Sequence, residues 1–379
     1  MFTIRYCSRK REHVLYVNTI EHTGRALERA AADKLRELLG SASWLEGWVV
    51  ERHPSLQGFD LRAKLPIRGR KPIELWVQCK SDPRPSLFPY TFVASEVTPP
   101  PVLVFAAPYI SPNMARTCEE NGWGWFDLAG NCRLEIPGAL LLERKGNAPV
   151  HEPPRPSANI GSAESARVIR ALLVPDNAGK KWTQREMQLH CEPSVSLGLV
   201  NKVVRYLRDE AFIESSDDGF RVRDPQKLLF AWRDAYRFDR HKQRRYFTLK
   251  RGPELKQALL SLKSITGGHA AYCAFSAADF QAPHVRQPRT WLFIGADWEE
   301  ECAAALDAKI VDTGENLMVL IPDDLGVFYG QESLGKSLAC TNPVQTYVDL
   351  WHGGSRGQEA ADGLLDQKLR PEWKARGLL

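Results

Sequence analysis

Hydrophobic and polar positions recur along this chain with two periods, one typical of helices and one typical of strands. The apolar positions that share one side of a helix over residues 25–39 are Leu27, Ala31, Leu35 and Leu38. Another helix is predicted to begin after Ser111, which precedes Pro112. Short apolar runs that predict strands lie at 48–50, 59–61, 73–78, 102–106, 123–126 and 132–136. The first part of the chain is therefore predicted to be an α/β domain.

The middle of the chain predicts two short helices and a hairpin. Thr183 is a good cap for a helix over 184–190, since Glu186 stands where it completes a capping box. The next helix is predicted from Ser194 or Ser196 to Asp209. Its apolar stripe consists of Leu199, Val200, Val203, Val204 and Leu207. Strands at 212–214 and 220–223 follow around a tight turn, which is the element order of a winged helix-turn-helix. A helical hairpin that only packs is the alternative.

The polar face of that helix indicates a use for the motif, because recognition helices meet base edges with their first turns and phosphates with their flanks. The residues expected to face the major groove of double-stranded DNA are Ser194, Ser196, Asn201, Lys202 and Arg205. Asparagine is suited to adenine and arginine to guanine. The remaining predicted DNA-binding residues are Thr183, Arg208, Arg221 and Arg223, of which the last two lie on the wing.

Positive charge continues directly after the wing. Between Arg221 and Arg251 there are eleven Lys and Arg residues against three acids, whereas the whole chain has a net charge of +5. We expect a basic helix over 225–245 that attracts DNA phosphates, with a solvated helix face as the alternative.

Composition narrows the class of protein. The chain has 379 residues, of which 43% are hydrophobic and 26% charged, so a multidomain globular protein is expected. It shows no long apolar run and no apolar signal core after Met1, which predicts a cytoplasmic protein without a membrane segment. The cysteines are scattered singly, which predicts reduced and mostly buried thiols.

Two joints divide the sequence into a predicted multidomain α+β protein. Residues 147–162 are rich in proline and small polar residues and predict a linker, and a weaker boundary lies near residue 250. The predicted domains are 1–146, 163–250 and 251–379. Predicted elements of the last domain are strands at 271–273, 291–294 and 317–321 and helices at 299–308 and 344–352.

The last domain is predicted to have an α/β fold similar to nucleotidyltransferases. Its Gly267-Gly268 pair resembles the loop with which those enzymes approach a triphosphate, ahead of a helix of small residues. The next strand, 289–295, lacks the pair of metal-binding aspartates that those enzymes need. A phosphate-transferring activity is therefore not expected there, and His269 is expected to be structural.

Polar residues near two predicted strand ends form the candidate catalytic site. Asp60 and the Gln78-x-Lys80 pair are expected to converge, and Glu28 lies on the preceding helix. Asp60 would hold a divalent metal such as Mg²⁺, while Lys80 positions the attacking water. The arrangement resembles the PD-(D/E)XK restriction-endonuclease-like superfamily, in its Mrr-type form, over residues 20–110. One carboxylate and a neutral glutamine provide few of the charged oxygen ligands that a divalent metal prefers. The alternative is therefore an inherited nuclease-like fold without activity.

A second resemblance rests on several strings in order along the chain. They are residues 126–131, the winged helix, 232–236, 344–350 and 356–361. With them, the chain after residue 120 resembles the AbiEi-like antitoxins of type IV toxin–antitoxin systems. This resemblance implies a bacterial regulator that represses its own operon and counters a nucleotidyltransferase toxin. The long N-terminal domain and the central position of the winged helix depart from simple members.

Three hypotheses follow from the sequence. The first is a sequence-specific transcriptional regulator of double-stranded DNA, a repressor that needs no cofactor and binds as a homodimer. The second is a metal-dependent DNA endonuclease in which the winged helix selects the site while Asp60, Gln78 and Lys80 cut. The third is an interaction module whose C-terminal domain docks a toxin or a second subunit.

Overall fold

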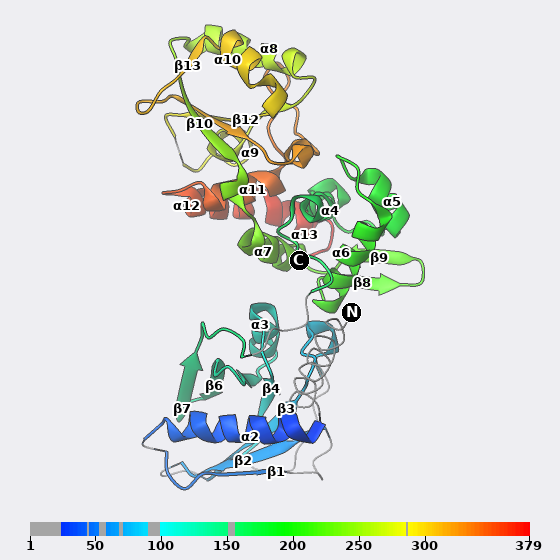
Figure 1. The fold of residues 1–379 in the computed structure, drawn as a ribbon, viewed down its shortest axis with the longest axis vertical. Coiled ribbons are helices and arrows are strands. Elements are labelled where there is room, and N and C mark those ends of the chain that lie inside the picture. Colours follow the sequence, from blue (N-terminus) through cyan, green and yellow to red (C-terminus); the bar gives the residue numbers. More distant parts are fainter. Residues whose placement is uncertain are drawn as a thin grey trace, which may run out of the picture. The chain divides into compact units, whose positions relative to one another are not determined.

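The computed structural model describes residues 24–43, 45–52, 58–67, 71–89, 99–150, 156–285 and 287–379. The chain forms two compact units, Met1–Arg155 and Pro156–Leu379, whose elements are labelled in Figure 1. Residues 151–155 of the expected linker lie outside the described residues. Across the described ranges, no helix combines the length and the apolar character needed to cross a membrane. Cysteines in these ranges are free, and all but Cys79 are buried, as expected.

The N-terminal unit is built on a seven-stranded mixed sheet whose strands follow chain order. Its strands are β1 (Val49–Arg52), β2 (Leu61–Leu65), β3 (Ile73–Cys79), β4 (Val102–Ala107), β5 (Gly124–Asp127), β6 (Cys132–Ile136) and β7 (Leu140–Arg144). The first three strands are antiparallel, β3, β4 and β5 are parallel, and the last three are antiparallel. Each strand expected here is present, although β2 begins one residue after Asp60, and β7 is additional.

Two helices cover opposite faces of this sheet (Figure 1). On one face, α2 (Gly24–Gly40) buries the expected stripe of Leu27, Ala31, Leu35 and Leu38. On the other face, α3 (Pro112–Glu120) packs against an aromatic cluster that includes Phe59 and Trp123. The hydroxyl of Ser111 accepts a hydrogen bond from Met114 N at 3.2 Å, as expected for the cap. A short 3₁₀ helix, η1 (Pro85–Leu87), precedes β4.

The turn between β5 and β6 depends on a glycine and a buried asparagine. Gly130, rather than Asn131, has the positive φ, at 91°. Asn131 is buried, and its backbone and side-chain N–H groups donate to the two carboxylate oxygens of the fully buried Asp127, each at 2.9 Å. These bonds favour the ionised carboxylate, although burial has the larger effect and raises the pKa of Asp127.

The C-terminal unit begins with one helix that was not predicted and a short 3₁₀ turn, followed by the two helices and the hairpin expected for the middle of the chain. These are α4 (Ala163–Leu173), η2 (Pro175–Asn177), α5 (Gln184–His190), α6 (Leu197–Asp209), β8 (Ile213–Ser216) and β9 (Gly219–Val222). We call residues 163–222 the helix-hairpin segment. Trp182 extends the hairpin, because its backbone exchanges two hydrogen bonds of 2.8 Å with Phe220. Figure 1 shows the hairpin projecting from beside α6.

A five-stranded mixed sheet with the order β11-β12-β14-β10-β13 forms the rest of this unit. Its strands are β10 (Lys242–Thr248), β11 (Ala270–Tyr272), β12 (Thr290–Ile294), β13 (Ala308–Ile310) and β14 (Leu317–Ile321). Its longer helices are α7 (Pro225–Ala235), α8 (Gly252–Ile265), α9 (Ala274–Gln281), α10 (Glu299–Ala305), α11 (Pro343–His352), α12 (Gly357–Leu364) and α13 (Arg370–Ala375). Shorter ones are η3 (Phe238–Arg240), η4 (Ala296–Trp298), η5 (Leu325–Phe328) and the π-helical η6 (Leu365–Leu369).

Three expectations for this unit were wrong. The basic helix predicted over 225–245 ends at Ala235, and residues 242–248 form β10, which pairs with β14 on one side and β13 on the other. The helix predicted over 299–308 ends at Ala305, because Ala308 begins β13. The Gly267-Gly268 turn precedes strand β11 rather than a helix. In each case pairing within the sheet overrides the local preference of the residues.

One hydrophobic core joins the helix-hairpin segment to the helices that follow the sheet. It extends from Ile160 through Val200 and Phe220 to Trp232, Tyr347 and Trp373. The other face of the sheet has its own cluster, which includes Leu262, Leu292 and Val319. The expected structural role of His269 is confirmed by its ring, which stacks on Trp298 at 4.8 Å between centroids.

Candidate functional site

Helix α6 has one buried face and one exposed face. Val200, Val203 and Leu207 have no exposed surface, and the half-buried Leu199 packs against the same core. The opposite face exposes Gly198, Lys202, Arg205 and Arg208. Ser196 begins the helix, and its hydroxyl accepts a hydrogen bond from Leu199 N at 3.1 Å. The amphipathic pattern therefore folds as expected and leaves a polar, cationic surface on α6.

The start of α5 is fixed by the expected capping box. The Thr183 hydroxyl accepts from Glu186 N at 3.2 Å, and the Glu186 carboxylate accepts from Thr183 N at 2.8 Å. The hydrogen bonds that the Glu186 carboxylate accepts from Thr183 N and from Thr183 Oγ1 lower the pKa of Glu186. The Thr183 side chain is exposed, but its hydroxyl is already used in the cap of α5. A ligand therefore competes with the cap for this hydroxyl.

A short chain of side chains connects α5 to α6. Asn201 Nδ2 donates to Gln184 Oε1 at 3.2 Å, and Arg205 donates to Asn201 Oδ1 at 3.4 Å. Asn201 is half-buried, whereas Arg205 is exposed. Two of the residues expected in the major groove are thus brought together and held in one orientation.

The turn before α6 is anchored from behind. Arg167 on α4 donates to the Ser194 carbonyl at 2.9 Å and also forms an ion pair with Asp324. Ser194 itself is exposed, next to the buried Val195. The position of this turn is therefore tied to the loop that follows β14.

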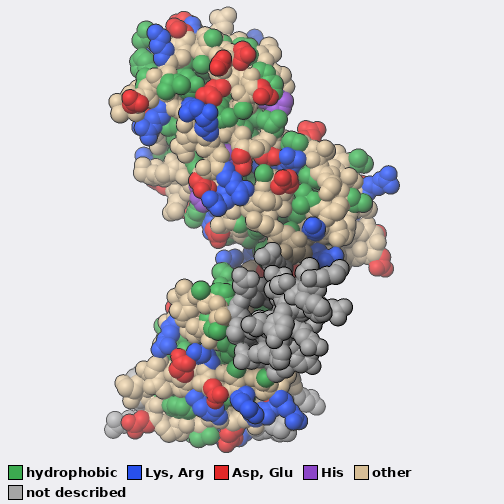
Figure 2. Space-filling view, viewed as in Figure 1, with side chains coloured by type: hydrophobic (Ala, Val, Ile, Leu, Met, Phe, Trp, Pro, Cys, Tyr) green, Lys and Arg blue, Asp and Glu red, His purple; other side chains and the backbone are tan. Residues whose placement is uncertain are grey.

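The hairpin and the basic segment are less free to bind anions than their charge implies. Arg221 on β9 pairs with Glu214 on β8 at 2.8 Å, while Arg223 is exposed. Further basic residues of 221–251 that pair with acids are Arg233, Arg237, Arg244 and Lys250. Figure 2 shows acidic and basic side chains interspersed on the visible face of this unit. The local excess of Lys and Arg is therefore partly neutralised within the fold.

In the N-terminal unit, Asp60 lies at the end of β3. Its Oδ2 accepts a hydrogen bond from Cys79 N at 2.7 Å. Burial raises the pKa of Asp60, and the nearby Glu28 carboxylate adds to this, whereas the Cys79 hydrogen bond and the charges of Lys80 and Arg52 act the other way. Glu28 is itself paired with Arg52. The structure thus brings together Asp60, Glu28 and Lys80.

Gln78 lies apart from that group on the sheet. Because side chains alternate along a strand, it is on the face opposite Val77 and Cys79, which pack toward α2. The side chain of Gln78 is buried, and in the described part of the chain its Oε1 has no hydrogen-bond partner. No group of three His, Cys, Asp or Glu side chains suited to a metal is found within the described ranges.

A buried polar network in the C-terminal unit went unnoticed in the sequence. Gln345 Nε2 donates to Tyr236 Oη and to Asp349 Oδ1, each at 2.8 Å, and Tyr236 Oη donates to Asp349 Oδ1 at 2.9 Å. Arg170 donates to Gln345 Oε1 at 2.8 Å. Burial raises the pKa of Asp349 to about 7. The signal available in the sequence was Gln345 and Asp349 at helical spacing i, i+4 within a mostly apolar helix.

Comparison with known protein families finds a similarity to transcriptional regulators over part of this unit. Residues 221–370 match the family model described as a transcriptional regulator, the AbiEi antitoxin of a type IV toxin–antitoxin system. The match begins within β9 and ends at the start of α13, so it covers less than the expected resemblance from residue 120 onward. Neither the search of curated proteins nor that of solved structures gave a match.

Proposed function

We propose that this protein is a transcriptional regulator of the antitoxin type that binds double-stranded DNA through the helix-hairpin segment. The observation that carries this proposal is the exposed face of α6. Among the described residues, Lys202 and Arg205 on that face form no ion pair, in contrast to the paired cations after the hairpin. Unpaired cations beside a helix that begins at an exposed cap are suited to phosphate and base contacts. The match of residues 221–370 supports the regulatory role.

In this proposal α6 acts as the recognition helix of a winged helix-turn-helix. Asn201 and Arg205 read base edges, since the bond between them already orients both side chains. Ser194, Ser196 and Lys202 lie at the start of the same surface, with Thr183 and Arg208 at its flanks. On the hairpin, Arg223 contacts the backbone directly, whereas Arg221 must first exchange Glu214 for a phosphate.

The test is DNA binding by the full chain to duplexes taken from around its own gene. The double variant Asn201→Ala with Arg205→Ala should weaken specific binding at least tenfold, because each bidentate base contact contributes on the order of 1–3 kcal/mol. The matched control is Lys242→Ala with Gln243→Ala, which also removes one cation and one amide, from exposed positions on β10. If both double variants bind like the wild type, α6 is not the recognition helix.

The antitoxin role implies a protein partner, the toxin, and a symmetric dimer of this protein on DNA. We infer that residues 251–379 contact a cognate toxin and that the protein acts as a homodimer on a palindromic site. Co-expression with a toxin encoded beside the gene should give a complex that survives gel filtration and leaves DNA binding by α6 intact. Loss of the complex on changing α6 residues alone would contradict separate surfaces.

A second candidate function is DNA cleavage by the N-terminal unit. It rests on the grouping of Asp60, Glu28 and Lys80 at one end of β3. Carboxylate oxygens are the ligands that Mg²⁺ prefers, but Glu28 is held by Arg52 and Gln78 lies on the other face of β3. The described donors therefore do not complete a magnesium site, and we derive no metal-dependent step. Plasmid nicking in Mg²⁺ or Mn²⁺ that disappears in Lys80→Ala would establish this function, and absence of nicking in both metals would exclude it.

A further inference from the structure

Arg170 on α4 is a buried cation whose hydrogen bonds go to neutral oxygens. Its side chain is 2% exposed. Its Nε donates to Gln345 Oε1 at 2.8 Å, and Nη1 donates to the Ala166 carbonyl at 3.4 Å. The guanidinium also lies 5.5 Å from the centroid of the Trp232 ring. Buried charges are costly unless a counter-charge contacts them directly, and burial accordingly lowers the pKa of Arg170.

Two carboxylates near Arg170, those of Asp324 and Asp349, are committed to other groups, whereas a third, Asp323, lines the same pocket as Arg170. Asp324 accepts two hydrogen bonds from Arg167 Nε, at 3.2 and 3.0 Å, and a third from Arg167 Nη2. Asp349 accepts from Tyr236 and Gln345, and at neutral pH it is partly protonated, because burial raises its pKa to about 7. Within the described part of the chain, no carboxylate forms a hydrogen bond with Arg170 that would neutralise it.

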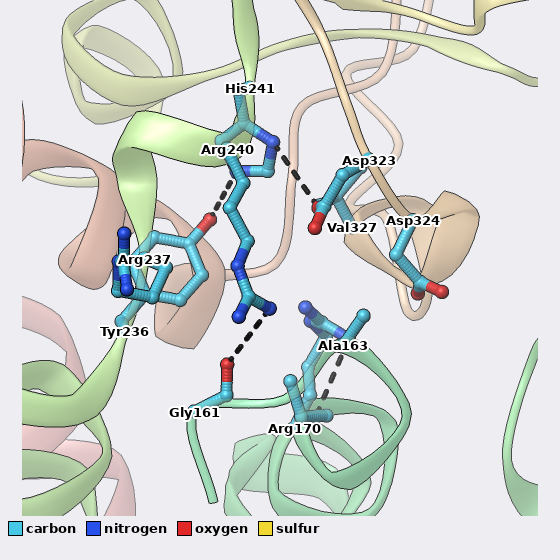
Figure 3. Close-up of a pocket in the computed structure, with 11 residues that line it drawn as sticks. Gly161, Ala163, Arg170, Tyr236, Arg237, Arg240, His241, Asp323, Asp324 and Val327 are labelled. Atoms are coloured by element: carbon cyan, nitrogen blue, oxygen red, sulfur yellow. Dashed lines mark hydrogen bonds and ion pairs between the residues drawn. The ribbon is translucent and has the colours of Figure 1, made fainter.

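Arg170 faces a pocket between α4, η3 and the loop that leads to η5. The residues lining it include Gly161, Arg170, Arg240, His241, Asp323 and Asp324. Figure 3 shows Arg240 entering from the side opposite α4, so that the guanidinium groups of Arg170 and Arg240 approach the same space. The one hydrogen bond of Arg240 in this pocket goes to the Gly161 carbonyl at 3.5 Å. Two cations thus border one small pocket.

The opposite wall of the pocket offers hydrogen-bond acceptors. His241 is 5% exposed, and its Nδ1 has no hydrogen-bond partner among the residues that the structure describes. Burial lowers the pKa of His241 to about 4, so the ring is neutral near pH 7. Its Nε2 lies 2.7 Å from Tyr236 Oη, whose own proton goes to Asp349, so Nε2 carries the ring proton and Nδ1 is an acceptor. Asp323 Oδ1 lies 3.7 Å from His241 Nδ1. Both atoms are hydrogen-bond acceptors, so neither donates a hydrogen bond to the other.

We propose that this pocket binds inorganic phosphate that retains a proton. Arg170 and Arg240 hold two of its oxygens, and the P–OH group donates to Asp323 or to His241 Nδ1. This arrangement discriminates by protonation. Sulfate at neutral pH has no hydrogen to donate and meets the Asp323 carboxylate unfavourably. A phosphate monoester loses its last proton near pH 6 and meets the same obstacle.

Phosphate bound in this pocket is also expected to affect the position of α6 and hence DNA binding, a consequence that rests on the proposed function. Arg167, one turn before Arg170 on α4, holds both Asp324 at the pocket and the Ser194 carbonyl before α6. Helix α4 also packs directly on α6. A ligand that neutralises Arg170 therefore acts on the helix that positions the proposed DNA-reading surface.

Calorimetric titration of the full chain at pH 7 and constant ionic strength tests the site itself. Inorganic phosphate should bind at least tenfold more tightly than sulfate or glycerol 3-phosphate. Arg240→Gln should weaken phosphate binding about tenfold or more, the loss of one hydrogen bond between charged groups. Lys242→Gln, an equal charge change at an exposed position on β10, should leave it unchanged. Asp323→Asn should bring sulfate close to phosphate in affinity.

Three results would overturn the site: no heat with phosphate, equal affinity for phosphate and sulfate, or unchanged phosphate binding in Arg240→Gln. The link to DNA has a separate readout, operator affinity with phosphate or sulfate at matched ionic strength. Phosphate should shift that affinity in the wild type and not in Arg240→Gln. A chain that binds phosphate but no DNA contradicts the proposed function and leaves the site standing. Phosphate binding with unchanged operator affinity contradicts the link.

Discussion

The buried carboxyl of Asp349 makes the stability of the C-terminal unit depend on pH. The side chain is fully buried on α11 among Arg170, Gln345 and Tyr236, and no described residue forms a hydrogen bond with its Oδ2. Its pKa is about 7 in the folded protein against 3.8 for the free carboxyl. Between these values the folded state binds more protons than the unfolded state, so stability falls as pH rises from about 4 to 7.

The size of this effect follows from the difference in pKa. A difference of about 3 corresponds to about 4 kcal/mol in the free energy of unfolding, at about 1.4 kcal/mol for each pKa unit. Asp349→Asn removes the titration and keeps an oxygen for the hydrogen bonds from Tyr236 and Gln345. The wild type should therefore lose about 4 kcal/mol relative to this variant as pH rises from 4 to 7, with little further change at higher pH.

Urea unfolding of both proteins at half-unit pH intervals measures this difference. Asp312→Asn, which changes an exposed carboxyl of the same unit, is the control and should follow the wild type. Parallel stability curves for wild type and Asp349→Asn between pH 4 and 7 would refute the reasoning, because the carboxyl would then titrate alike in both states.

Two further predictions concern the helix-hairpin segment. Thr183→Ala removes the hydroxyl that accepts from Glu186 N and should lower the free energy of unfolding by about 1 kcal/mol, whereas Thr183→Ser should retain most of it in thermal melts. Gly219→Ala places a Cβ 2.5 Å from the Trp182 carbonyl, which pairs with Phe220 N, and φ at Gly219 is +142°. It should cost about 1–3 kcal/mol and weaken amide protection at Phe220 in hydrogen exchange, and unchanged protection there would contradict the contact.

Local signals predicted α5, α6 and the hairpin, though not α4, and most of the N-terminal sheet from the sequence. Capping at Thr183 and Ser196 and the stripe on α6 depend on residues three or four positions apart, and such patterns are visible in one sequence. β10 was missed because its charged residues resemble a helix face, and its strand state depends on pairing with β13 and β14. The candidate catalytic residues were brought together only in part: Glu28 and Lys80 lie close enough to Asp60 to affect its pKa, whereas the Gln78 side chain lies on the face of β3 that points away from α2.

The phosphate pocket and the network beneath it lay beyond sequence reasoning. Arg170 and Gln345 are 175 positions apart, and Tyr236 and Asp349 are 113 apart. Nothing local marks Arg170, which follows the helical pattern of α4 like any cation on a solvated face. Its burial is decided by the return of α11 onto α4, a property of topology rather than of neighbouring residues.

The single hydrophobic core that runs from Ile160 to Trp373 limits where the gene for this protein can recombine with related genes. A module that exchanges freely between genes needs a seam across which few apolar contacts pass. Here Val200 of α6 and Trp373 of α13 belong to the same packed cluster, and the family match begins at residue 221, within strand β9 of the hairpin. Recombination at that point would leave half a hairpin on each parent. We therefore expect the helix-hairpin segment and the domain after it to unfold as one cooperative unit. We also expect their sequences to have diverged together rather than as two interchangeable parts.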